Sequence, residues 1–268
     1  MSSMPAGVSR PMRTTRGRIL FTGERLSARV AWYAPGSRMP AHTHDCHQVS
    51  LLLAGTLAER GKGEEVRLGV PAVGVKPAGL AHANDYGPAG ALVLGIDLPG
   101  DLDLPRAIGL APDWRWRTRP ASPLLGQGGA LLSVLAAGAS APDAVESQAW
   151  ELLAAMAGCA DRRGGSPPRW VARACERLQE EAVPLAWLAA EQGVHPVYFA
   201  RGFARWVGCP PSVFRVRAQL QRGLAQVAAG VPLSAAALHA GFADQAHFSR
   251  IARHHCGVAP ARLRALLA

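Results

Sequence analysis

The stretch GFADQAHFSR, residues 241–250, decides how the C-terminal part of this chain folds. Gly241 interrupts a run of helix-favouring residues, and Asp244 is a residue type that caps the first turn of a helix. After that cap the pattern predicts an amphipathic helix whose inner face carries Phe248. A short helix over residues 232–240 precedes the glycine. The stretch therefore indicates a helix, a tight turn and a second helix.

The same arrangement occurs earlier in the chain, over residues 184–206. Gly193 separates a short helix from a second one, whose inner face carries Phe199 and Phe203. Between the two units the pattern predicts a long helix over about residues 211–229. The second helix of a helix-turn-helix unit can enter the major groove of DNA. Periodicity alone leaves an ordinary helical bundle open as the alternative.

The charge distribution favours an acidic polymer as the partner of this part of the chain. The formal net charge is +10. Residues 169–268 hold twelve arginines against five acidic residues, which is a net charge of +7 on well under half of the chain. A basic segment of this kind is typical of proteins that bind nucleic acid.

The second unit, together with GVAPARLR at residues 257–264, resembles the signature of the AraC/XylS transcription regulators, G-F-x-D/S-x-S-x-F-S-R followed by G-x-x-P-x-x-x-R. The first unit is similar to the first helix-turn-helix of that family, and the resemblance covers about residues 170–268. His195 departs from it by standing where the family usually has a capping Ser, and Ala252 replaces a Phe. The resemblance implies a sequence-specific transcription regulator, not an enzyme. Its implied partners are double-stranded DNA and RNA polymerase.

The resemblance also implies roles for residues on the two reading helices. Arg201 and Arg250 each follow a buried Phe by two positions, so they leave the inner face. An Arg there can contact guanine or phosphate, or can be a solvated surface residue. The implied base-reading residues are Val197, Ala200, Arg201, Gln245, Ala246, Ser249 and Arg250. The implied phosphate contacts are Arg205, Arg215, Arg217 and Arg253.

Residues 18–98 have a different texture, with short apolar runs separated by Gly and Pro turns, which predicts a compact all-β barrel or sandwich. Residues 36–55 have the spacing G-x5-H-x-H-x3-Q-x6-G. This spacing resembles the first cupin motif, except that Gln48 stands in place of Glu. PAGLAH, at residues 77–82, is similar to the second cupin motif.

The two motifs together imply one shared site formed by His42, His44, Gln48 and His82. A spacing of two along a strand places His42 and His44 on the same face, and neutral imidazoles bind divalent transition metals. The residues leave two alternatives open. The site holds either a divalent transition metal or, without metal, an organic effector or simple packing contacts.

The sequence as a whole predicts an α+β multidomain chain. It has a tail at 1–17, a cupin-like sensor barrel at 18–122, a helical region at 123–163, a linker at 164–168 and an all-α domain with two helix-turn-helix motifs at 169–268. By resemblance, the helical region would form a homodimer. The five cysteines are scattered, which favours reduced thiols, and neither a signal segment nor a membrane span is evident. We therefore expect a cytoplasmic protein without a membrane partner.

These observations converge on a DNA-binding transcription regulator controlled by a small-molecule or metal effector in the barrel. A metal-dependent cupin enzyme with a helical appendage is the alternative from another class. Gln48 in place of Glu and the helix-turn-helix signature both count against that enzyme. A regulator whose barrel serves only for dimerisation also stays open.

Overall fold

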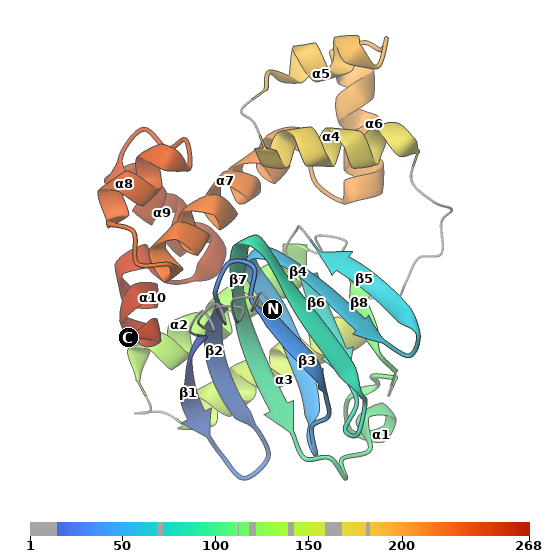
Figure 1. Cartoon of the computed structure of the whole chain (residues 1–268), viewed down its shortest axis with the longest axis vertical. Coiled ribbons are helices and arrows are strands. Elements are labelled where there is room, and N and C mark those ends of the chain that lie inside the picture. The colour runs from blue at the N-terminus through green and yellow to red at the C-terminus, as the bar shows by residue number, and fades with distance from the viewer. Residues whose placement is uncertain are drawn as a thin grey trace, which may run out of the picture.

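A computed structural model describes residues 15–68, 72–111, 113–117, 122–138, 142–158, 168–180 and 183–268. Nearly all of the expected tail, Cys159 and all but the last residue of the expected linker lie outside the described residues. The architecture is α+β, with an antiparallel sheet in the N-terminal part and helices in the C-terminal part (Figure 1). The expected fold class is confirmed. None of the described helices is both long enough and apolar enough to cross a bilayer.

The described strands form one antiparallel sheet in the order β1-β2-β7-β4-β6-β8, with β3 paired to β7 and β5 paired to β4. Two long strands, β4 and β7, pair along most of their length and form the centre of the sheet. The bounds are β1 Arg16–Thr22, β2 Ser27–Tyr33, β3 Arg38–His42, β4 His47–Gly61, β5 Glu64–Leu68, β6 Ala72–Lys76, β7 His82–Leu98 and β8 Arg115–Arg117.

The helices follow the sheet in the chain. Their bounds are α1 Leu104–Ile108, α2 Ser122–Ala137, α3 Pro142–Gly158, α4 Arg169–Glu180, α5 Leu185–Glu191, α6 Pro196–Val207, α7 Pro211–Ala228, α8 Leu233–His239, α9 Gln245–Cys256 and α10 Pro260–Leu267. Helices α2 and α3 pack against each other. Helix α7 joins α4–α6 to α8–α10 and packs on β4 and β7 (Figure 1).

The C-terminal part contains two separate cores. The first, around Phe199, Phe203 and Phe214, holds α4, α5, α6 and the start of α7 together. The second contains Phe242 and Phe248 and is continuous with the core of the sheet and of α2 and α3. The second helix-turn-helix therefore packs on the N-terminal part, whereas the first has a core of its own.

Two glycines allow α2 to lie between the sheet and α9. A Cβ atom at Gly128 would come within 2.1 Å of Leu51 Cδ2 in β4. A Cβ atom at Gly129 would come within 3.0 Å of the main-chain carbon of Cys256, at the end of α9. Side chains at these positions would push the neighbours apart, because interiors of this density have no room for extra atoms. Helix α2 thus contacts β4 on one side and the end of a reading helix on another.

Candidate functional site

Three histidines meet inside the barrel. His42 ends β3, His44 follows it in the adjoining turn, and His82 begins β7, where it pairs in register with His42. Each offers one ring nitrogen, and these three atoms all lie within 4.8 Å of one another. Two paired strands and the turn that follows one of them therefore bring together three of the four residues that the cupin-like motifs indicated.

Two of these rings are oriented by main-chain oxygens. His42 Nδ1 lies 2.8 Å from the carbonyl oxygen of Pro40, and His82 Nδ1 lies 3.1 Å from that of Leu80. A carbonyl oxygen can only accept, so each Nδ1 carries the proton and each Nε2 keeps a free lone pair. Within the described part of the chain, Nε2 of His42 is buried and has no hydrogen-bond partner. A metal ion would satisfy this orphaned acceptor.

The surroundings favour the neutral form of two of the imidazoles, those of His44 and His82. Burial, followed by the charges of His42, His82, Lys76 and Arg29, lowers the pKa of His44 from 6.5 to about 4. Burial also lowers the pKa of His82. Neutral imidazole is the form that coordinates a metal, so the cluster is ready to bind one near neutral pH.

The fourth predicted residue, Gln48, lies in the wall of the same cavity but is bound to another group. Its Nε2 donates to Asp97 Oδ1 at 3.2 Å, and the other oxygen of Asp97 pairs with Arg29. Gln48 is buried at the start of β4. The structure thus shows a site of three histidines, with an amide nearby that Asp97 holds in place.

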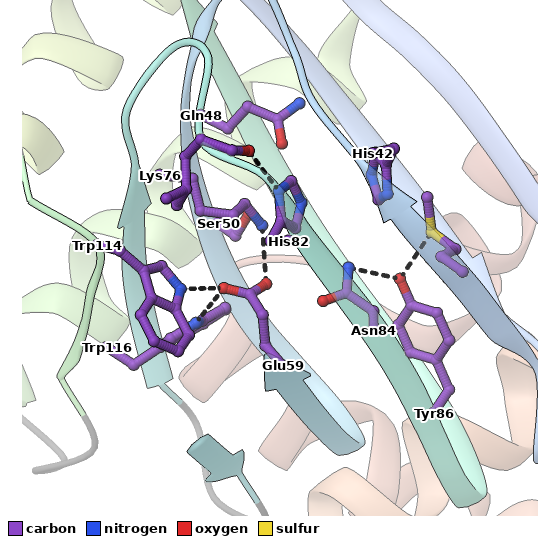
Figure 2. Close-up of polar contacts among 12 residues, drawn as sticks. His42, Gln48, Ser50, Glu59, Lys76, His82, Asn84, Tyr86, Trp114 and Trp116 are labelled. Atoms are coloured by element: carbon purple, nitrogen blue, oxygen red, sulfur yellow. Dashed lines mark hydrogen bonds and ion pairs between the residues drawn. The ribbon is translucent and has the colours of Figure 1, made fainter. Parts of the chain in front are cut away.

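A buried carboxylate that the motifs did not indicate lies next to the histidines (Figure 2). Glu59 is fully buried, and its Oε1 accepts from Trp114 Nε1 at 2.5 Å and from Trp116 Nε1 at 2.8 Å. Its Oε2 accepts from Lys76 Nζ at 3.2 Å. For Lys76 the available signal was a single charged residue within an otherwise apolar stretch, whereas Glu59 stands directly before Arg60 in a charged segment and gave no such signal.

The space between these groups is small. The cavity measures about 50 Å³ and is lined by the three histidines and their neighbours. Its polar lining residues include Gln48, Ser50, Lys76, Asn84 and Trp116. Pockets for larger organic ligands measure roughly 300–1,000 Å³. The cavity therefore suits an ion with a few further atoms.

The two predicted reading helices begin at side-chain caps. His195 caps α6, with its Nδ1 accepting from the main-chain N–H of Val197 at 3.3 Å. Asp244 caps α9 by accepting from the N–H of His247 at 2.6 Å. His195 thus takes the capping position in place of the Ser that the resemblance led us to expect.

Comparison with known proteins bears directly on these helices. Residues 188–265 match the model of a helix-turn-helix domain family. The C-terminal part of this chain is an AraC-type helix-turn-helix domain. This domain supports the function of a DNA-binding transcription regulator. None of the curated proteins compared with the chain matches it.

Several solved structures are similar to parts of the chain. KdgF from a Halomonas species is 20% identical, with a TM-score of 0.31, and the match covers 35% of this chain and 85% of KdgF. A cupin superfamily protein from Desulfitobacterium hafniense is 17% identical over 34% of this chain and 84% of its own, with a TM-score of 0.31. A variant of apo ToxT from Vibrio cholerae is 9% identical over 92% of this chain and 99% of its own, with a TM-score of 0.39. The assignment as a regulator rests on the AraC-type domain.

Most of the residues expected to read bases lie at the surface of the AraC-type domain. On α6 and α9 they surround the buried Phe199 and Phe248. Tyr198, which the motif did not indicate, is 76% exposed on α6 beside Val197. The exposed members of the expected set are Val197, Arg201, Gln245, Ala246 and Arg250, and the half-buried ones are Ala200 and Ser249.

The arginines expected to contact phosphate differ in exposure. Arg205 and Arg253 are exposed, and Arg215 is half-buried. Arg217 is only 9% exposed, and its Nε and Nη1 have no partner among the described residues. A phosphate contact by Arg217 does not fit this placement, because the residue is buried. The other three arginines stay as expected phosphate contacts.

Proposed function

We propose that this chain is a transcription regulator whose DNA binding is controlled by a divalent transition metal held by His42, His44 and His82. The observation that carries the proposal is the convergence of three imidazoles, two of them oriented by main-chain carbonyls, in a chain that also contains a helix-turn-helix domain. The cavity of about 50 Å³ favours a metal over a larger metal-free organic effector. We expect the protein to act in the cytoplasm.

The donor set fits the metal proposed. Three neutral nitrogen donors suit zinc, iron, nickel or copper better than magnesium or calcium, which prefer oxygen ligands. Two of the rings have their second nitrogen fixed by a carbonyl, an arrangement that accompanies metal-binding histidines in general. Gln48 could add its amide oxygen as a fourth, neutral ligand and still keep its hydrogen bond to Asp97, because that bond uses the amide nitrogen.

The packing offers a direct connection between the barrel and one reading helix. Leu51 of β4 contacts α2 at Gly128, and Gly129 of the same helix contacts the end of α9 at Cys256. Ser50, the neighbour of Leu51, lines the histidine cavity. We infer that a change in β4 on metal binding alters how α9 is held, because packed interiors transmit small displacements.

For the DNA-binding part, we propose that α6 and α9 enter successive major grooves. Arg201 and Arg250 would read guanine, and Arg205, Arg215 and Arg253 would hold phosphates. We also propose homodimerisation through residues 123–163. Because α2 packs against α3 and α9, the contact surface would come mainly from the exposed face of α3.

The test measures metal content and DNA affinity together on the full chain. Elemental analysis should find about one transition-metal ion per chain, and chelation should change affinity for a selected DNA site. His44→Ala should abolish both effects, while the exposed His254→Ala should leave the metal content unchanged. Equal metal content in wild type and His44→Ala would overturn the proposal, as would an affinity for DNA that never depends on metal.

A further inference from the structure

The fixed charges around the histidine cavity cancel in pairs. Lys76 lies 3.2 Å from Glu59, and Arg29 forms an ion pair with Asp97. Gln48 adds no charge to the wall. A divalent ion held by three neutral imidazoles would therefore keep its full charge of about +2 in a half-buried site. Such a charge is costly unless an anion accompanies it.

Lys76 can bind that anion directly. Lys76 is 6% exposed and lines the same cavity, and its ammonium has three N–H donors. One points to Ser50 Oγ at 3.3 Å and one to Glu59 Oε2 at 3.2 Å. Those two contacts leave one donor for a molecule in the cavity.

Glu59 can share Lys76 without becoming an unsatisfied buried charge. Its Oε1 keeps the two indole donors of Trp114 and Trp116. With its amide nitrogen turned toward Glu59, Asn84 also donates to Oε2 at 3.0 Å. Three donors therefore remain when Lys76 turns partly to a ligand, so the cost of recruiting Lys76 is small.

The size of the cavity limits the ligand. A single water needs roughly 10–15 Å³ on the same measure. The 50 Å³ here takes a metal ion with a few heavy atoms and is too small for a sugar. A planar carboxylate has two oxygens on one carbon and so can bind two cationic groups at once.

We propose that the barrel site takes a small carboxylate, with one oxygen on the histidine-held metal and the other accepting from Lys76 Nζ. This inference rests on the proposed function, because the metal supplies half of the binding. The effector is then a small carboxylate, and Lys76 is the residue that selects for its negative charge.

The experiment uses the full chain loaded with Co²⁺, whose visible absorption reports its ligands. Acetate and formate are titrated at constant ionic strength, with acetamide as the neutral molecule of matching shape. We expect both carboxylates to shift the Co²⁺ bands with saturation, and acetamide to leave them unchanged. Lys76→Gln should weaken acetate binding about 10- to 100-fold, the range expected for loss of one charged hydrogen bond.

Two further variants keep the test decisive. Lys62→Gln changes the exposed lysine of the β4–β5 turn and should bind acetate like the wild type. If Lys76→Gln does not fold, the double variant Lys76→Met/Glu59→Gln removes both charges of the buried pair. It keeps an oxygen to accept from the indoles, and it should also lose acetate binding.

The outcomes separate this inference from the proposed function. Absence of Co²⁺ binding, or Co²⁺ bands that are the same in His44→Ala, would overturn the proposed function. Normal Co²⁺ bands that respond equally to acetate and acetamide would overturn the carboxylate inference alone. Acetate affinity that is unchanged in both Lys76 variants would overturn the role of Lys76.

Discussion

The guanidinium of Arg262 in α10 donates two hydrogen bonds to the main-chain carbonyl oxygen of Ala136 in the last turn of α2. Its Nε lies 2.8 Å from that oxygen, and Nη2 is the second donor. The carbonyl has no partner within its own helix, and a cation there also fits the helix dipole. This contact joins the last helix of the DNA-binding domain to the helix that covers the sheet.

Loss of this contact should uncouple the two parts of the chain. We expect Arg262→Ala to lower the free energy of unfolding by about 1 kcal/mol, since the side chain is partly exposed and the bond is charged. It should also reduce the dependence of DNA affinity on metal. Chemical denaturation and DNA titration measure the two effects. Arg264→Ala, an exposed change on the same helix, serves as the control.

The close approach of α2 to α9 can be tested with a matched pair of glycines. Gly129→Leu should destabilise the chain by about 1–3 kcal/mol, because its side chain would meet the main chain of Cys256. Gly126→Leu should be neutral or stabilising, since nothing lies within 4 Å of a Cβ atom there and Leu favours helix. Urea midpoints compare the two. Equal destabilisation would contradict the packing described.

The reading helices make separable contributions to DNA binding. Arg201→Ala and Arg250→Ala should each cost about 1–3 kcal/mol at a cognate site and relax base preference at one position. Arg253→Ala should weaken binding evenly across sequences and reduce its salt dependence. Binding selections with each variant measure its base preference and its affinity across DNA sequences. Unchanged base preference in both of the first two variants would contradict the placement of α6 and α9.

The lowered pKa of His44 predicts how the metal-free chain responds to acid. In the unfolded chain His44 titrates near 6.5, whereas in the folded chain its pKa is about 4. Between these values the unfolded state binds more protons, so stability should fall as the pH drops from about 6.5 to 4. In EDTA, His44→Asn should flatten this dependence, and His254→Asn should not. Denaturation curves across this pH range provide the measurement.

The sequence motifs indicated the three histidines because they reflect local geometry. His42 ends β3 and His44 lies two residues further on in the adjoining turn, and the register between β3 and β7 places His82 opposite His42. The partners of Glu59 could not be inferred in this way. Lys76 pairs in register with Gln48 at the start of β4, whereas Glu59 lies near the other end of β4. Trp114 and Trp116 belong to a segment without periodicity, so their shared acceptor could not be inferred.

The burial of Arg217 illustrates a second limit. Helical periodicity places a residue on a face of α7, but it does not say what that face contacts. Here tertiary contacts bury Arg217, and a sequence pattern does not encode them. The double helix-turn-helix was predictable because caps, glycine breaks and buried aromatics all lie within short segments. The docking of its second unit on the sheet depends on tertiary contacts between distant segments.

The division of the C-terminal part between two cores bears on how this protein can evolve. Substitutions on α6 can change the recognition of one half of an operator while the surfaces joined to the barrel stay intact. Substitutions on α9 act on a helix whose far end contacts α2. There, selection has to preserve the packing against α2 as well as the recognition of DNA. Lineages of such a regulator should diversify in α6 first, and new operators should differ mainly in the half that α6 reads.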